Sequence, residues 1–260
     1  EVIQAQGYQG GYTAVKDAVR ELRQYSREVF VPLRHVPGEA QVDFGEALIK
    51  RGDVLRKVHF FVMALPHSDG FFVKSYEREN TESFQDGHVE AFKFFGGVPR
   101  RISYDNARIS VSKIIGAHAR FLTDGFLQLQ SHYLFDHHFC RVRRPNEKGV
   151  VEGIVRYSRQ NFFVPVPQVR DLNELNAYLA ERCRDDLQRK LRGKGATKEE
   201  LLTEERTVFL PLPPTDFDAS RKRSTTVNSL SLVRFDCNDY SVPVEYAYRP
   251  VVVKGYMDRV

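Results

Sequence analysis

The stretch AQVDFGEALI at residues 40–49 decides the fold, because an acidic residue interrupts an apolar segment that has the alternation of a β-strand. Asp43 lies between Val42 and Phe44. Successive side chains of an extended strand point to opposite faces, so we expect the carboxylate of Asp43 on the face opposite its two apolar neighbours. Such a strand would bury its apolar side chains on one face and hold the carboxylate of Asp43 on the other.

The segments that follow predict a mixed sheet covered by helices. Further strand-like segments lie at residues 57–65, 70–75, 98–104 and 135–142, and helical segments lie at 81–95, 123–134, 147–163 and 171–192. A turn at residues 66–69 is typical of a hairpin, and Gly96 followed by Gly97 is typical of a helix stop. The order β-β-β-α-β-α-β-α predicts an α/β protein with a mixed five-stranded sheet.

Both ends of the chain lie outside this sheet. Residues 7–27 form an amphipathic helical stretch, which is either the last helix of a helix-turn-helix or a connector. The helix at 171–192 carries an apolar stripe on a charged surface, and a proline-rich stretch follows it. From residue 224 the pattern is again that of strands. We expect the start of a small, truncated β-barrel there.

The composition favours a folded protein of a reducing compartment. Of the 260 residues, 42% are hydrophobic, which suffices for one large or two small domains. No apolar run reaches the ~18 residues of a membrane helix, and no basic-then-apolar leader opens the chain. Three widely spaced cysteines, an odd number, predict no disulfide framework and a cytoplasmic location. The formal net charge of +5 is compatible with a polyanionic partner.

Three carboxylates lie beside distinctive neighbours in segments far apart in the chain. Besides Asp43, these are Asp105, which follows the strand at 98–104, and Glu152, which lies in the helix at 147–163. Converging carboxylates can hold a pair of Mg²⁺ ions, because this hard cation prefers carboxylate and water oxygens. Such a pair can activate a water or a sugar hydroxyl for in-line attack on a phosphodiester.

Helix geometry separates a buried and an exposed stripe around Glu152. Val151, Ile154, Val155 and Ser158 share the stripe that is expected to pack on the sheet. Lys148, Glu152, Arg156 and Arg159 run along a neighbouring stripe, close to the basic cluster Arg141, Arg143 and Arg144. The cationic stripe is either a ladder of ion pairs or a surface that contacts DNA phosphates. In the second case these six basic residues are the candidate DNA contacts.

Other polar groups are weaker candidates. Glu46 lies three residues beyond Asp43, so strand alternation places it on the opposite face, where it can only support the site indirectly. Asn106, next to Asp105, is a candidate for the same supporting role. His137, His138 and Cys140 lack a fourth ligand at zinc spacing, so packing is the better interpretation.

The segments VDFGEA, YDN and EKGVVEGIVRYSRQNFFVP resemble those of the IstA-type transposases of bacterial insertion sequences. These transposases belong to the DDE transposase and retroviral-integrase superfamily, which has an RNase H-like fold. The resemblance covers about residues 30–192 and, more loosely, the segments on either side. It implies that Asp43, Asp105 and Glu152 form the catalytic triad and hold two Mg²⁺ ions, for which Mn²⁺ can substitute.

The spacing of the triad carries a further expectation. The separations are 105 − 43 = 62 and 152 − 105 = 47 residues. The second is longer than is usual in integrases, so we expect additional structure around residues 107–121. Within the resemblance, Lys148 and Gly149 fix the register that selects Glu152 over Glu147. These two acids are five residues apart, about 140° around a helix, and cannot both face one metal pair.

The resemblance also implies function and organisation. It implies metal-dependent cleavage of DNA 3′ ends and strand transfer, acting on transposon-end and target double-stranded DNA in a homo-multimeric synaptic complex. It further implies an AAA+ ATPase helper of the IstB type and a location at the bacterial nucleoid. The predicted parts are the end of a helix-turn-helix domain with its connector at 1–30, an RNase H-like catalytic domain at 31–168, a helical spacer at 169–209, a proline-rich basic linker at 210–223 and a barrel start at 224–260.

Two alternatives remain open from the sequence. A simple RNase H-like nuclease needs the same triad but no flanking DNA-binding segments. A catalytically silent DNA-binding or synapsis protein needs the fold but no intact acids.

Overall fold

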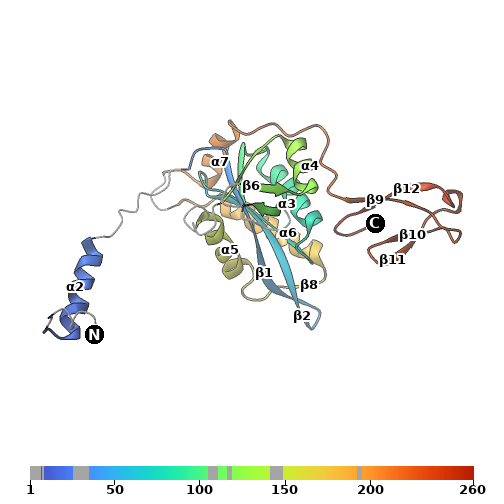
Figure 1. Ribbon diagram of the computed structural model, residues 1–260. Coiled ribbons are helices and arrows are strands. Elements are labelled where there is room, and N and C mark those ends of the chain that lie inside the picture. The colour runs from blue at the N-terminus through green and yellow to red at the C-terminus, as the bar shows by residue number, and fades with distance from the viewer. Residues whose placement is uncertain are drawn as a thin grey trace. The chain divides into compact units, whose positions relative to one another are not determined.

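The chain forms two compact units, Glu1–Arg34 and His35–Val260. This computed structural model describes residues 7, 9–25, 35–104, 111–115, 119–140, 149–191 and 195–260. The described part of the first unit is essentially one helix, α2 (Tyr12–Tyr25), which lies within the predicted helical stretch (Figure 1). Whether it belongs to a helix-turn-helix stays a prediction, as do the finer domain boundaries.

The second unit is built on a mixed sheet with the strand order β3-β2-β1-β4-β7. Its strands are β1 (Glu39–Arg51), β2 (Val54–Leu65), β3 (Gly70–Tyr76), β4 (Arg101–Tyr104) and β7 (Asp136–Phe139), and the short β8 (Gln168–Val169) pairs with the end of β1. The first three strands are antiparallel, whereas β4 and β7 run parallel to β1. The five predicted strands and the mixed character of the sheet are confirmed.

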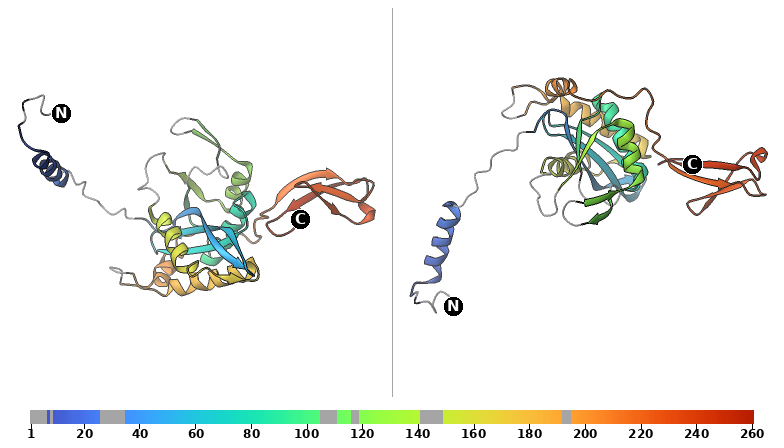
Figure 2. Two further views of the ribbon diagram at one scale, coloured as in Figure 1. Left: turned by 90° about the horizontal axis from the view of Figure 1, so that it is seen from below. Right: turned by 45° about the horizontal axis from the view of Figure 1, so that its top comes forward.

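Helices cover both faces of this sheet (Figures 1 and 2). The helices are α3 (Thr81–Phe95), α4 (Asp124–Tyr133), α5 (Gly149–Phe162), α6 (Leu172–Leu187) and α7 (Lys198–Arg206). Side chains of α3 and α4 share one core cluster with the sheet, and those of α5 and α6 share the other. The predicted helix stop is confirmed at Gly96, which caps α3 with a φ of 75°.

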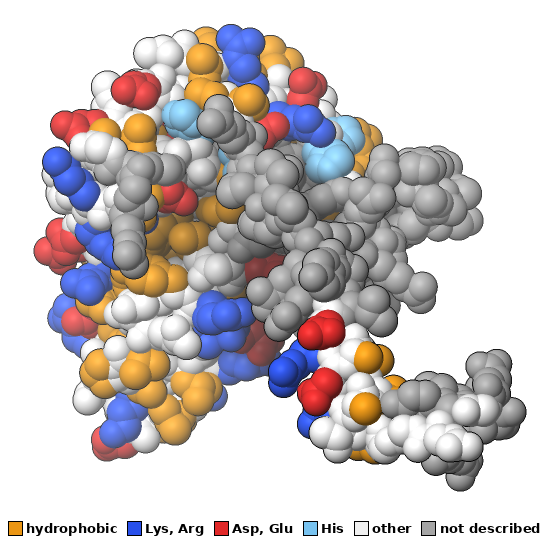
Figure 3. Space-filling view, turned by 90° about the vertical axis from the view of Figure 1, so that its left-hand side faces the viewer, with side chains coloured by type: hydrophobic (Ala, Val, Ile, Leu, Met, Phe, Trp, Pro, Cys, Tyr) orange, Lys and Arg blue, Asp and Glu red, His pale blue; other side chains and the backbone are white. Residues whose placement is uncertain are grey.

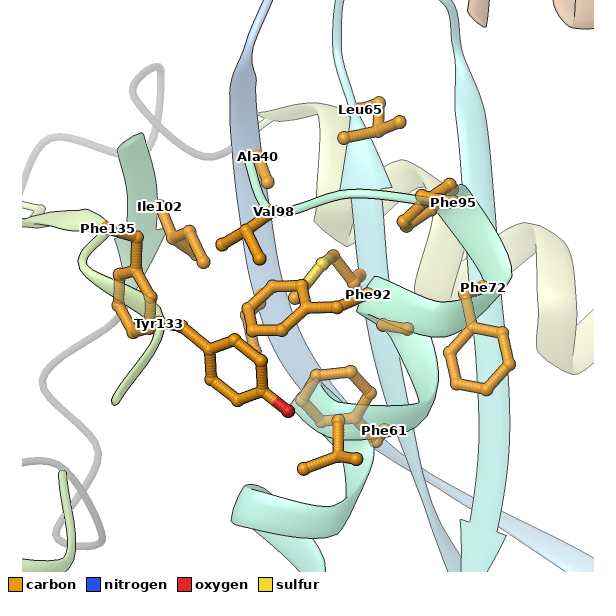
Figure 4. Close-up of a cluster of buried hydrophobic side chains, with 14 of the residues drawn as sticks. Ala40, Phe61, Leu65, Phe72, Phe92, Phe95, Val98, Ile102, Tyr133 and Phe135 are labelled. Atoms are coloured by element: carbon orange, nitrogen blue, oxygen red, sulfur yellow. The ribbon is translucent and has the colours of Figure 1, made fainter. Parts of the chain in front are cut away.

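The two core clusters are rich in aromatic side chains. In the first, the rings of Phe61, Phe92 and Tyr133 lie between the sheet, α3 and α4, and the centroids of Phe92 and Tyr133 are 4.8 Å apart (Figure 4). In the second, Phe60 stacks on Phe163 at 5.0 Å beneath α5. Burial of such rings on both faces fixes which face each β1 side chain takes, and thereby orients Asp43.

The helix predicted at residues 171–192 is shorter than expected. α6 ends at Leu187, and α7 begins at Lys198 after an antiparallel bridge between Lys190 and Thr197. The Asp186 carboxylate near this end lies 2.5 Å from the Lys198 ammonium, and both groups are 4% exposed. This buried pair holds the start of α7 against the end of α6, an arrangement that one continuous helix would not allow. The apolar stripe of α6 packs on the sheet of its own chain.

An additional hairpin follows β4, as the spacing of the acids predicted. Its strands β5 (Val111–Ile115) and β6 (Ala119–Leu122) pair antiparallel and precede α4. The predicted insertion around residues 107–121 is therefore confirmed for the strands that the structure describes.

The C-terminal segment contains strands but no closed barrel over residues 210–260. β9 (Arg221–Thr226) pairs with β12 (Pro250–Gly255), and β10 (Leu232–Phe235) pairs with β11 (Asn238–Ser241). The short 3-10 helix η2 (Val244–Tyr246) follows β11 and precedes β12 in the chain. Val227, Val233, Phe235 and Val253 form a small core of their own. Two two-stranded ladders leave open edges, so the predicted barrel is not confirmed, and neither is a separate helical spacer.

Composition gave two expectations. Cys140 and Cys183 are buried and Cys237 is exposed, and the expectation of no disulfide framework stays a prediction. None of the helices in the described ranges is both long and apolar enough to cross a membrane.

Candidate active site between strand β1 and helix α5

Asp43 lies in the middle of the sheet. It pairs with Val62 of β2, and the residue before it, Val42, pairs with Tyr104 of β4. Val42 is buried in the core under α3, whereas Asp43 is half-buried, as the alternation predicted. One carboxylate oxygen of Asp43 accepts a hydrogen bond from the Phe44 amide at 3.0 Å, so the carboxylate is held beside the strand backbone.

Asp105 and Asn106 lie outside the described residues. The last described residue before them is Tyr104, which pairs with Val42 and is 2% exposed. Its hydroxyl lies 2.9 Å from Nε2 of His88, whose other ring nitrogen lies 2.7 Å from the Phe84 carbonyl oxygen. The end of β4 is therefore fixed one strand away from Asp43 by both a ladder and a buried side-chain bond.

Glu152 lies in the first turn of α5 and is exposed. The residue before it, Val151, is fully buried, and its amide donates a hydrogen bond of 3.1 Å to Oε1 of Gln41. Gln41 lies two residues before Asp43, on the same face of β1. This bond between α5 and β1 places the backbone of Glu152 close to the strand that carries Asp43.

The buried stripe of α5 is confirmed, and the exposed stripe is confirmed for the members that the structure describes. Val151, Val155 and Ser158 are buried, and Ile154 packs against the same core. Glu152, Arg156 and Arg159 are exposed.

The exposed stripe of α5 is described only from Glu152 onward, because Lys148 lies outside the described residues, so the choice between an ion-pair ladder and a DNA-contacting surface stays open. Within the described part, Arg159 donates from Nε to the carbonyl oxygen of Glu46 at 3.0 Å. The other candidate DNA contacts, Lys148 and the arginines at 141, 143 and 144, lie outside the described residues.

Glu46 takes the opposite face of β1, as alternation predicted. Its carboxylate lies 3.0 Å from the Lys57 ammonium and 3.7 Å from Nδ1 of His59. The hydrogen bond and the charge of Lys57 lower the pKa of Glu46. A supporting role for Glu46 and Asn106 stays a prediction.

An acid that the sequence did not single out adds to the charge near Asp43. Glu79 lies in the segment between β3 and α3. Burial raises the pKa of Glu79, and the charges of Asp43 and Glu46 raise it further, while His59 lowers it. Glu79 has no distinctive neighbours in the sequence, and only the fold brings it near β1.

Gly45 explains why the motif around Asp43 contains a glycine. A β-carbon at this position would lie 2.3 Å from the ring of Phe60 on the neighbouring strand. The absent side chain lets that ring cross β1 and stack on Phe163 under α5. The glycine thus serves the packing of the helix that carries Glu152.

His137 in β7 contacts an amide group and an aromatic ring. Nδ1 of His137 lies 2.8 Å from Nε2 of Gln130, and its ring meets Phe126 edge-on. Cys140 is buried. Across the described ranges, which exclude Asp105, no three His, Cys, Asp or Glu side chains are grouped so that they could hold a metal ion.

Comparisons with known proteins extend over nearly the whole chain. It is 32% identical to the transposase for insertion sequence element IS21 from Pseudomonas aeruginosa, over 99% of this chain and 68% of that protein. The chain belongs to the family of IS21-type insertion-sequence transposases. It is also 35% identical to a transposase from Aminobacter aminovorans, over 98% of this chain and 52% of the relative. The chain thus spans about half the length of that relative.

Two further comparisons address the parts of this transposase-family chain. Residues 212–260 match the Mu transposase C-terminal domain family. A chain of the simian T-cell lymphotropic virus intasome, solved in complex with the PP2A regulatory subunit B56 gamma, aligns with a TM-score of 0.50 and 17% identity. That alignment covers 76% of this chain and 68% of the viral one. The likeness shows the fold alone: a mixed α/β domain like that of the intasome chain.

Proposed function

We propose that this chain carries the catalytic core of a DDE transposase that cleaves DNA at transposon 3′ ends and transfers the freed strand to target DNA. The proposal rests on one observation above all: the Gln41–Val151 hydrogen bond joins the strand of Asp43 to the first turn of the helix that carries Glu152. Family membership supports the reaction class. Asp105 follows Tyr104 in the sequence, and Tyr104 pairs with Val42, the residue before Asp43, which supports our proposal that Asp105 completes the site.

The proposed ligands suit Mg²⁺ or Mn²⁺. Asp43 and Glu152 supply hard carboxylate oxygens, and Glu79 adds negative charge that favours cations nearby. Asp43, Asp105 and Glu152 would hold two ions. When bound, the ions would activate the attacking oxygen and stabilise the charge that develops on the phosphate.

The chain's own residues would bind and orient the DNA. Arg156 and Arg159 lie on the same exposed stripe of α5 as Glu152, and we propose that they and the basic residues at 141, 143, 144 and 148 contact phosphates flanking the cleaved bond. In the first step a water oxygen attacks the phosphorus and the bond to the 3′ oxygen breaks, which leaves a 3′ hydroxyl. In the second step the oxygen of this hydroxyl attacks the phosphorus of a target phosphodiester, the target P–O3′ bond breaks, and the target strand is left with a 3′ hydroxyl. This exchange needs no covalent protein intermediate and no ATP.

We propose the assembly from family membership, and this proposal does not depend on the proposed catalytic mechanism. Synapsis of two transposon ends calls for a homo-multimer on double-stranded DNA, and target selection calls for a separate AAA+ ATPase of the IstB type. Both would act in the bacterial cytoplasm at the nucleoid. The two alternatives differ from a transposase in their products. A simple RNase H-like nuclease would cut DNA without joining the 3′ end to a second DNA, and a silent synapsis protein would not cut DNA at all.

The test uses the full-length transposase on a DNA substrate that carries a transposon end. Asp43→Asn, Asp105→Asn and Glu152→Gln should each abolish Mg²⁺-dependent cleavage while end binding persists, because each removes a charge but keeps the shape. Asp53→Asn, at the far tip of the β1–β2 hairpin, is the matched control and should cleave normally. Cleavage retained in one triad variant would remove that residue from the site, and for Glu152 the next acid to test would be Glu147.

Cleavage products separate the alternatives. Joined products in the wild-type reaction support the transposase, whereas cutting without joining supports a nuclease. Binding without either reaction supports the silent synapsis protein.

A further inference from the structure

A buried glutamine connects the two elements that carry Asp43 and Glu152. Gln41 is 4% exposed, although its side chain is polar. Its Oε1 accepts the amide hydrogen of Val151 at 3.1 Å, across a sequence separation of 110 residues. Gln41 lies two positions before Asp43, and Val151 lies one position before Glu152. The bond thus joins the strand segment next to Asp43 to the helix segment next to Glu152.

The amide that Gln41 binds needs an acceptor from outside its helix. The first N–H groups of an α-helix have no carbonyl partner within the helix. Val151 is the third residue of α5 and is fully buried, so water does not serve its amide. The side chain of Gln41 therefore acts as a cap that the sheet supplies to the helix.

The other contacts of α5 act elsewhere along the helix or lack direction. Val151 and Val155 pack in the core beneath the helix, and apolar packing specifies position less strictly than a hydrogen bond does. The bond from Arg159 to the Glu46 carbonyl and the bond of 3.1 Å from the Tyr157 hydroxyl to Asp186 both lie in the second half of α5. Of the bonds that the described residues make, the one to Gln41 fixes the first turn, where Glu152 lies.

We propose that Gln41 is a positioning residue that sets the place of Glu152 relative to Asp43, and that this inference rests on the proposed function of these acids. Mg²⁺ demands near-ideal octahedral geometry, so a shift of the first turn of α5 would weaken metal binding and cleavage. Gln41 touches neither substrate nor metal in this proposal and acts through the Val151 amide.

The test compares Gln41→Met with a matched variant in the full-length protein. Methionine keeps the length of the side chain and removes the acceptor. Gln85→Met is the control, because Gln85 is 3% exposed and its amide likewise binds a helix backbone, donating to the Gly125 carbonyl at 2.9 Å. That bond anchors α4, which carries none of the proposed catalytic acids.

Three readouts distinguish positioning from general destabilisation. Gln41→Met should lower the rate of end cleavage about ten- to a hundredfold and raise the Mg²⁺ concentration at half-maximal rate, with end binding unchanged. Without metal, amide hydrogen exchange should accelerate in the first turn of α5 and not in its second half. The rise in melting temperature on adding Mg²⁺ should shrink. Gln85→Met should move none of these three.

Two more variants keep the test decisive if Gln41→Met does not fold. Gln41→Glu retains an acceptor and should cleave faster than Gln41→Asn, whose shorter side chain withdraws it. Equal rates for these variants, or a Gln41→Met protein with wild-type rate, Mg²⁺ requirement and exchange, would overturn the inference. A wild-type protein that does not cleave ends with Mg²⁺ would instead refute the proposed function.

Discussion

Gly45 shows how one missing side chain supports the site. Phe60, whose ring would lie 2.3 Å from an added β-carbon, is fully buried and stacked on Phe163, so it has little room to move. Gly45→Ala should therefore lower the free energy of unfolding by about 1–3 kcal/mol through overpacking. Urea denaturation of the chain measures this.

Gly153→Ala is the control for that substitution. Gly153 lies in α5, and no atom lies within 4 Å of the position that an added β-carbon would take. Alanine favours helix over glycine, so this variant should be neutral or more stable by up to about 1 kcal/mol. If Gly45→Ala leaves the free energy of unfolding unchanged, the ring of Phe60 can move away from an added methyl group, and the predicted overpacking is wrong.

His88 makes stability depend on pH. It is fully buried in α3, and burial lowers its pKa from 6.5 to about 3, although its bond to the Phe84 carbonyl opposes the shift. The unfolded chain binds a proton below pH 6.5 while the folded chain does not, so stability falls as pH falls from about 6.5 towards 3. At pH 5 the loss should be about 2 kcal/mol.

The measurement is the difference between wild type and His88→Gln. The free energy of unfolding should fall more between pH 7.5 and pH 5.0 for the wild type than for the variant, because the variant lacks the titrating ring. Glu205 acts with the opposite sign, because burial raises its pKa, but it is common to both proteins and cancels in the difference. Parallel pH dependence in the two proteins would contradict a neutral buried His88.

Among the elements, α6 owes its place to its apolar stripe. Leu175 and Leu179 are fully buried and pack in the core that α6 shares with the sheet. Leu179→Asp would bury a charge without a partner and should lower stability by at least about 3 kcal/mol. Tyr178→Asp, at a position that is 37% exposed, should change it little. A Leu179→Asp protein that folds normally and fails only to assemble on paired DNA ends would place α6 at an interface between protomers.

Local sequence patterns were sufficient to predict most helices and strands, and to predict on which face of its element Asp43 and Glu152 each lie. Alternation in β1 placed Asp43 opposite Val42, and helical periodicity placed Glu152 opposite Val151. Both are short-range properties that a strand or helix imposes on its own residues. They predict which face a carboxylate takes, but not which groups it meets.

Contacts between distant residues were beyond local patterns. The buried pair of Asp186 and Lys198 joins the end of α6 to the start of α7, and the bond from Val151 to Gln41 joins positions 110 residues apart. The proximity of Glu79 to Asp43 likewise depends on the path between β3 and α3. The barrel expected after residue 224 rested on strand patterns alone, and these do not determine whether ladders close.

At the scale of the whole molecule, net charge does not identify a DNA-binding face. Figure 3 shows positive and negative side chains interspersed over the described part of one face. A binding surface must therefore come from placement near the site. Arg156 lies one turn beyond Glu152 on the exposed stripe of α5, whereas Arg184 lies exposed on α6.

This placement gives a prediction that separates a phosphate contact from a solvated surface charge. Arg156→Ala should weaken binding to transposon-end DNA and to unrelated DNA alike, because phosphates carry no sequence information. The slope of log K against log salt concentration should fall by about 0.9, the value for one lost phosphate contact on duplex DNA. Arg184→Ala removes the same charge from α6 and should leave the slope unchanged, which controls for the loss of net charge. Equal effects of the two substitutions in a binding titration would show that Arg156 acts only through net charge, and DNA would then have to approach Asp43 and Glu152 from another side.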